Sequence, residues 1–206
     1  MILIISITSL QFSRLQQLKS DVEKVDNTNP WIQNTAEQQL DILRLLPKFG
    51  YKNIFADWTF LNFLQYFGDS NLRQKIGYSL SANYFEVIID SDPYFIESYE
   101  FLVNSISIYA GQPQKTISLL EKGLETMTPN VPQHSYLLWR HKGTDELLFL
   151  GDTQSAQKSY EMAANWAEQS SAEDSFSVAA LSRQTAKFLE AAPNSNPAQI
   201  SAWSEV

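Results

Sequence analysis

The chain has 206 residues, of which 44% are hydrophobic and 13% aromatic, so it holds enough apolar side chains for one packed domain and is not a disordered chain. Its net charge is −8 at pH 7, and no segment gathers Lys and Arg side chains, which excludes nucleic acid as an expected partner. The absence of cysteine excludes disulfides, zinc–cysteine sites, iron–sulfur clusters and thiol catalysis.

The first twelve residues are mostly apolar and carry no charged side chain, and the first charged side chain is that of Arg14. This run is shorter than the roughly 20 residues that a membrane-spanning helix needs. Three interpretations stay open: a helix that packs on the domain or on a bilayer surface, the end of an anchor whose beginning is missing, and a buried first helix. Apolar residues continue at helical spacing in the next segment, at Leu15, Leu18, Val22 and Val25.

We therefore expect residues 1–30 to form an apolar N-terminal segment and a stem helix, with a short or truncated anchor and a plain amphipathic helix as the two alternatives. The expected location is a membrane, bacterial or organellar, and a soluble cytoplasmic protein is the alternative. Residues 192–206, rich in Pro, Asn and Ser, are expected to form a flexible C-terminal tail.

Residues 35–191 show helical patterns separated by short breaks that contain Gly or Pro, such as Asp92-Pro93 and Gly151-Asp152. The apolar run 55–67 has almost no polar face, which indicates a helix buried on most sides. The other expected helices cover about 80–91, 94–110, 114–126, 135–150, 154–169 and 174–191.

Two of the breaks begin the same pattern of small, large and small residues at offsets of 5, 9 and 12: Gly111 with Thr116, Leu120 and Gly123, and Gly151 with Ala156, Tyr160 and Ala163. Such spacing lets a second helix pack closely on the first, and it is the signature of a tetratricopeptide helix–turn–helix. A looser unit lies earlier: Trp58, Leu61, Leu64 and Gly68 in its first helix, and Tyr84, Phe85, Ile88 and Pro93 at the end of its second, with residues 69–77 inserted between them. The expected fold is all-α: a tetratricopeptide (TPR)-like helical-repeat solenoid of about three helix pairs, with an N-terminal helical stem and a C-terminal capping helix.

Four stretches carry a resemblance: ADWTFLNFLQYFGD at 56–69, DPYFIESYEF at 92–101, SLLEKGL at 118–124 and FLGD at 149–152. Across residues 40–170 the chain resembles uncharacterised bacterial membrane-tethered TPR-like proteins. The resemblance implies an α-helical repeat domain tethered to a membrane, and it implies no enzymatic activity.

The densest group of polar and aromatic residues is the segment 136–146. On a helix, Tyr136 and Trp139 share a face with Arg140 beside them, which would suit an anionic or C-terminal peptide. The alternative, which we favour because aromatic residues at helical spacing are usually core, is that Trp139 and Leu147 pack on neighbouring helices. In that alternative His141 and Asp145, four residues apart, form a solvated pair.

Catalytic and metal-binding chemistry find little support. The carboxylates of Asp145 and Glu146 should point in different directions from one helix, and Asp92 before Pro93 is typical of a turn. His141 and Asp145 supply at most two of the three or four ligands that a metal site needs. We therefore expect no enzyme activity, no catalytic residue, no cofactor and no metal.

The expected function is a non-catalytic protein–protein interaction scaffold or assembly factor that binds a partner peptide or helix in a concave groove. The first helix of each pair, 55–67, 94–110 and 135–150, would line it. The polar or amphipathic residues judged least needed for packing are the expected partner-binding residues: Asn62, Gln65, Tyr99, Asn104, Arg140 and Lys142. The alternative is a carrier or sensor of a small apolar or acyl ligand, enclosed by the aromatic helices 55–67 and 94–109.

Overall fold

The computed structural model describes residues 37–38, 40–44 and 50–191. The chain divides into two compact units, residues 1–39 and 40–206. The predicted anchor and stem, residues 1–30, and the predicted tail, residues 192–206, lie outside the described residues. Within the described ranges the chain is all-helical and has no strand, and no helix there is both long enough and apolar enough to cross a bilayer.

The helices of the second unit agree closely with the ranges expected from the sequence, with two differences. Residues 69–77, expected as an insertion, contain a short helix, whose first turn is capped by the Asp69 side chain accepting hydrogen bonds from the backbone N–H groups of Asn71 and Leu72. The expected helix 94–110 changes into a π-helix at Asn104. The elements are α3 (Lys52–Gly68), α4 (Ser70–Ile76), α5 (Ser81–Ser91), α6 (Ile96–Val103), η1 (Asn104–Tyr109), α7 (Pro113–Leu124), α8 (Tyr136–Leu148), α9 (Thr153–Gln169) and α10 (Ser175–Ala191).

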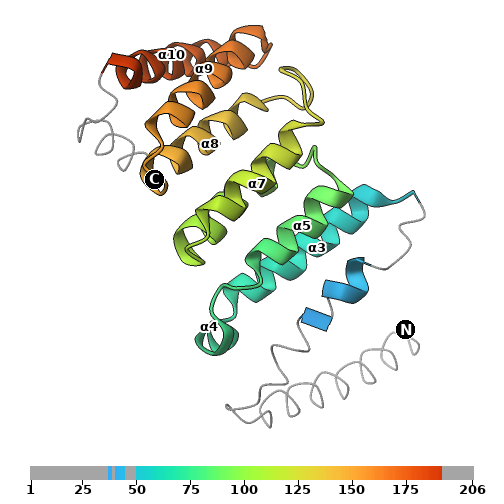
Figure 1. The fold of residues 1–206 in the computed structure, drawn as a ribbon. Helices are drawn as coiled ribbons and strands as arrows, with labels where there is room; N and C mark the ends of the chain where they lie inside the picture. The colour runs from blue at the N-terminus through green and yellow to red at the C-terminus, as the bar shows by residue number, and fades with distance from the viewer. Residues whose placement is uncertain (1–36, 39, 45–49, 192–206) are drawn as a thin grey trace, which may run out of the picture. The chain divides into compact units, whose positions relative to one another are not determined.

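Each helix packs mainly against helices that are near it in sequence. Helix α3 lies on α5, α7 contacts α5, η1 and α8, and α9 lies between α8 and α10 (Figure 1). Two turns that join neighbouring helices contain Gly111 and Gly151, both at φ +65°, a left-handed backbone that residues with a side chain rarely adopt. These are the two glycines at which the small–large–small pattern begins.

The small and large residues that follow the two glycines in that pattern are all buried, including Thr116, Leu120, Ala156 and Ala163. The helices approach so closely that a Cβ added at Gly123 would overlap the hydroxyl of Tyr99. A Cβ at Gly143 would lie 3.1 Å from the Tyr160 ring. Small residues at these positions therefore allow the close helix contacts that the spacing predicts.

The packing of α8, α9 and α10 confirms part of the interpretation of the segment 136–146. Leu147 is buried with Tyr160 and Leu189 in one cluster. The Trp139 ring packs edge to face on Trp166 of α9, with ring centroids 5.8 Å apart. Both side chains therefore pack on neighbouring helices, as expected.

The expectation that the 55–67 helix is buried on most faces is wrong. Helix α3 buries one face, which includes Phe63, whereas Ile54, Trp58 and Leu61 are 64%, 59% and 53% exposed. The reason is that α3 packs chiefly on α5. Among the described residues, no other helix covers the opposite side of α3 to the same extent. Helix α10 likewise exposes Phe176.

Candidate functional site: a cavity between α6–η1 and α8

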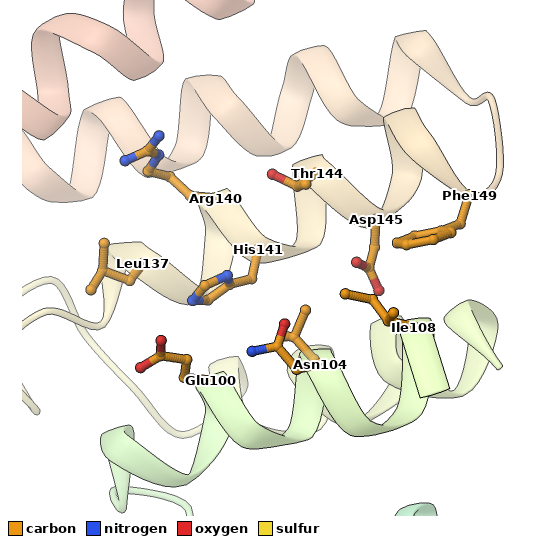
Figure 2. Close-up of a pocket in the computed structure, with 10 residues that line it drawn as sticks. Glu100, Asn104, Ile108, Leu137, Arg140, His141, Thr144, Asp145 and Phe149 are labelled. Atoms are coloured by element: carbon orange, nitrogen blue, oxygen red, sulfur yellow. The ribbon is translucent and has the colours of Figure 1, made fainter. Parts of the chain in front are cut away.

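A cavity of about 430 Å³ lies between α6–η1 and α8. Two of the three helices that the sequence assigns to a groove, 94–110 and 135–150, therefore border it. Figure 2 shows the side chains of η1 and α8 facing each other across it. The lining residues are Glu100, Val103, Asn104, Ile108, Leu137, Arg140, His141, Thr144, Asp145 and Phe149.

On the α6–η1 side, residues spaced four apart form one stripe: Glu100, Asn104 and Ile108. The π-helix begins within this stripe, and in it the N–H of Ala110 donates to the carbonyl of Ser105, five residues back, at 3.0 Å. π-Helical turns are frequent at functional sites, because the extra residue changes the direction of the side chains that follow. No local sequence pattern indicates this turn.

Asp145 lies at the inner wall of the cavity and is only 1% exposed. The Ser107 hydroxyl donates a hydrogen bond to its Oδ2 atom, and the Ser107 and Thr116 hydroxyls are 2.7 Å apart. The Oδ1 atom accepts no hydrogen bond from any residue that the structure describes. Burial raises the pKa of Asp145 to about 7, the Ser107 hydrogen bond acts against this increase, and the neighbouring Glu146 charge adds to it.

The expectation of a solvated His141–Asp145 pair is therefore wrong. Asp145 is buried and bonded to Ser107 of η1 because α8 has helices packed on more than one side. His141 is half-buried and faces the cavity in Figure 2. Burial, together with the charge of Arg140, lowers the pKa of His141 to about 4, so its imidazole is neutral at pH 7 and offers one donor and one acceptor.

Glu146 points to a different neighbour than Asp145 does, as expected for adjacent carboxylates on a helix. Its Oε2 accepts a hydrogen bond from Ser159 of α9 at 2.6 Å, and its Oε1 accepts one from Lys142 at 2.6 Å. The Lys142 ammonium also lies 3.3 Å from Glu121 of α7, and the side chain is only 11% exposed. Lys142 therefore holds α7, α8 and α9 together and does not line the cavity, contrary to its assignment as a residue little needed for packing.

The structure places the other predicted partner-binding residues in three different settings. Tyr99 is buried, and its hydroxyl donates to the Pro93 carbonyl at 2.9 Å, so it too is needed for packing, contrary to expectation. Asn62 donates to the backbone carbonyl one turn before it, and Gln65 is exposed, and neither is among the residues lining this cavity. Asn104 and Arg140 do line it.

Sequence reasoning missed these lining residues: Glu100, Val103, Ile108, Leu137, Thr144 and Phe149. Glu100 and Ile108 lie four residues before and after Asn104, so the helical spacing around Asn104 would have found both. Phe149 follows the last residue of α8, and no local pattern distinguishes it from a core aromatic residue.

The lining combines hydrogen-bonding groups with apolar walls, an arrangement suited to binding. Within the described ranges, no three His, Asp or Glu side chains come close enough together to hold a metal ion.

Comparison of the chain with family models, with curated proteins and with solved structures gives no match. Its function is therefore inferred from the cavity and from the helices that border it.

Proposed function

We propose that the protein is a non-catalytic interaction scaffold built from TPR-like helix pairs, which binds a peptide or helical segment of a partner protein. The observation that carries this proposal is the cavity of about 430 Å³ between α6–η1 and α8, the first helices of two successive pairs. Its size is within the usual range of ligand pockets, roughly 300–1,000 Å³, and suits one or two side chains of a bound peptide.

The residues at the cavity can bind a peptide without any chemical step. The amide of Asn104 and the neutral imidazole of His141 each combine a donor with an acceptor, which matches the N–H and C=O groups of a peptide backbone. Val103, Leu137 and Ile108 offer apolar surface for a side chain. In binding sites of this kind, polar groups usually fix the orientation of the ligand and apolar walls supply affinity.

The helix pairs themselves support the TPR-like part of the proposal. The left-handed glycines at Gly111 and Gly151 and the buried small residues after each of them occupy the positions that the repeat requires. In stacks of such pairs the first helices form the face that binds partners.

The alternative, a carrier of an apolar or acyl ligand, finds less support. Phe63 of α3 packs on Phe85 with ring centroids 4.6 Å apart, and Phe60 meets both Phe95 and Phe101 at 5.2 Å. The aromatic rings expected to enclose a ligand thus fill this space with one another. The cavity at α8, in turn, would bury an acyl chain against polar groups and leave them without partners, which is costly.

Selection from a random peptide-display library tests the proposal. The wild-type protein is expected to enrich peptides, and Asn104→Tyr, which fills the cavity, should weaken their binding about tenfold or more, as does the loss of a central interface contact. Gln114→Tyr, an equal change at an exposed position of α7, is the matched control and should bind like the wild type. No enrichment, or equal binding by Asn104→Tyr, would contradict a groove at this place.

The membrane tether is a separate part of the proposal and rests on the apolar residues 1–12. Fractionation of cells should place part of the full-length protein with the membranes and a variant lacking residues 1–12 in the soluble fraction. Equal distribution of the two proteins would refute the tether and leave the groove untouched.

A further inference from the structure

The carboxylate of Asp145 is incompletely bonded although it is buried. A buried polar atom nearly always has a hydrogen-bond partner, and one that lacks it costs about 1–3 kcal/mol. Oδ1 of Asp145 accepts no hydrogen bond from the described residues, whereas Oδ2 is bonded to Ser107. Since Asp145 lines the cavity, a group bound in the cavity is the natural partner for Oδ1.

Both protonation states of Asp145 leave the same gap. The ionised carboxylate lacks a donor at Oδ1. The acid protonated at Oδ2 lacks one there as well, and the acid protonated at Oδ1 would have no acceptor for that proton among the described residues. A donor that is also positively charged satisfies the ionised form best, because a charge-assisted hydrogen bond is roughly twice as strong as a neutral one.

The other lining residues indicate the shape of such a donor. Glu100 contributes a second carboxylate, and the walls include the apolar side chains of Val103, Ile108 and Phe149. In Figure 2 the Asp145 carboxylate points from α8 toward η1, with Ile108 and Phe149 beside it. Ile108 is 42% exposed, so part of its apolar surface is accessible to a ligand that approaches Asp145.

We propose that the cavity takes a basic side chain, lysine or arginine, of the bound peptide. Its apolar stem packs against Ile108 and Phe149, and its charged head meets Asp145. Glu100, which lies toward the other end of the cavity in Figure 2, adds a second negative charge. Side chains of this type combine an apolar stem with a cationic head. The apolar walls of the cavity match the stem, and its carboxylates match the head. This inference rests on the proposed function, because it identifies the anchoring residue of the peptide that the scaffold binds.

The positive charges near the cavity do not oppose a cation strongly. The His141 imidazole is neutral at pH 7. In Figure 2 the Arg140 side chain extends from α8 on the side away from η1, whereas Asp145 extends toward η1. The net charge of −8 on the chain also attracts cationic segments over longer distances.

A titration with three small probes tests the proposal directly. The probes are N-acetyl-lysine methylamide, the norleucine analogue with the same stem and no charge, and the glutamate analogue with the opposite charge. Amide chemical shifts of residues 100–108 and 137–149 report binding. The lysine probe should give saturable shifts in the millimolar range and bind about tenfold more tightly than the norleucine probe, the effect of one charged hydrogen bond.

Two variants and a control locate the contact. Asp145→Asn should weaken binding of the lysine probe severalfold, and Glu100→Gln, which removes a more distant charge, should weaken it by a smaller factor. Both variants should leave the weak norleucine binding unchanged. Glu97→Gln changes an exposed carboxylate on the same helix that does not line the cavity and should bind like the wild type. Because Glu100 is exposed, its variant remains informative even if Asp145→Asn disturbs the fold.

Several results would overturn the inference: no saturable shifts with the lysine probe, equal binding of the lysine and norleucine probes, or tightest binding of the glutamate probe, which would make the cavity an anion site at Arg140. The peptide selection separates this failure from failure of the scaffold proposal. Enriched peptides that lose binding with Asn104→Tyr but carry no basic anchor would keep the scaffold and refute the basic anchor. Saturable binding of the lysine probe without any enriched peptide would support a site for a basic side chain and refute the peptide-binding scaffold.

Discussion

Replacing Asp145 with asparagine should stabilise the protein at neutral and alkaline pH. Asparagine keeps the shape of the side chain and an oxygen for the Ser107 hydroxyl, but it carries no charge to bury. The pKa of Asp145 rises from 3.8 to about 7 on folding, which corresponds to about 4 kcal/mol of lost stability when the group is fully ionised in both states.

The direction of the stability change with pH, and the pH range over which it occurs, follow from the pKa of Asp145 in the unfolded and folded states. Between pH 3.8 and about 7 the unfolded chain has lost the Asp145 proton and the folded chain keeps it. Stability from this group is therefore fully present below pH 3.8 and is lost as the pH rises through about 7. Across pH 5 to 8 the loss amounts to about 2–3 kcal/mol, at about 1.4 kcal/mol per pH unit below the folded pKa.

His141 acts in the opposite direction and would mask this loss in the wild type alone. Its pKa falls from 6.5 to about 4 on folding, so this group adds stability as the pH rises from about 4 to 6.5. The informative quantity is therefore the difference between Asp145→Asn and the wild type, since His141 is present in both proteins.

Urea unfolding followed by circular dichroism, at several values between pH 5 and 8, measures this difference. The advantage of Asp145→Asn should grow with pH by about 2–3 kcal/mol. Asp152→Asn is the control: hydrogen bonds from Ser155 lower the pKa of Asp152, so this carboxylate is ionised in both states above pH 5 and its difference curve should be flat. A flat curve for Asp145→Asn, or a variant less stable than the wild type at pH 8, would refute the reasoning.

Three further substitutions test the packing and the groove. Gly123→Ala should destabilise by about 2 kcal/mol in urea unfolding, because overlap with the buried Tyr99 outweighs the gain in helix propensity; Gly68→Ala, which meets no atom within 4 Å, should be neutral or slightly stabilising. Ala163→Leu should cost about 1–3 kcal/mol, since Ala163 is fully buried, and an unchanged melting temperature would place it on the surface. Arg140→Ala should weaken binding of the selected peptides less than Asn104→Tyr does, because Arg140 lines the cavity but its charged end extends away from η1. Its stability loss should be about 1 kcal/mol because the side chain is half-buried, and unchanged affinity would remove Arg140 from the site.

The helix boundaries could be predicted because their causes are local. Gly111 and Gly151 are needed where the backbone is left-handed, and Asp92 accepts a hydrogen bond from the N–H of Tyr94 in the turn before α6. The π-helix could not be predicted in this way. Its Ser107 meets Thr116 of α7 and Asp145 of α8, partners 9 and 38 residues away in the sequence.

The candidate site was predicted in part for a related reason. Asn104 and Arg140 line the cavity, and both lie on helical segments that the sequence predicts at 94–110 and 135–150. The expectation for Tyr99 and Lys142 is wrong because a polar atom on a helical residue does not by itself indicate exposure. Each of them has a partner that the local sequence does not reveal, the Pro93 carbonyl for Tyr99 and Glu146 with Glu121 for Lys142.

Helix α8 shows why polarity alone misleads here, and it also singles out Asp145. Asp145 and Glu146 are adjacent, both are carboxylates, and both are almost fully buried, although such residues are usually exposed. Both oxygens of Glu146 are bonded, one to Lys142 and one to Ser159, so this side chain is fully used in joining α8 to α9. Asp145 has one bonded oxygen and one without a donor among the described residues, and it lies at a cavity. These two adjacent carboxylates thus differ in whether the fold supplies a hydrogen bond to each oxygen. That difference makes Asp145, rather than Glu146, the carboxylate expected to contact a ligand.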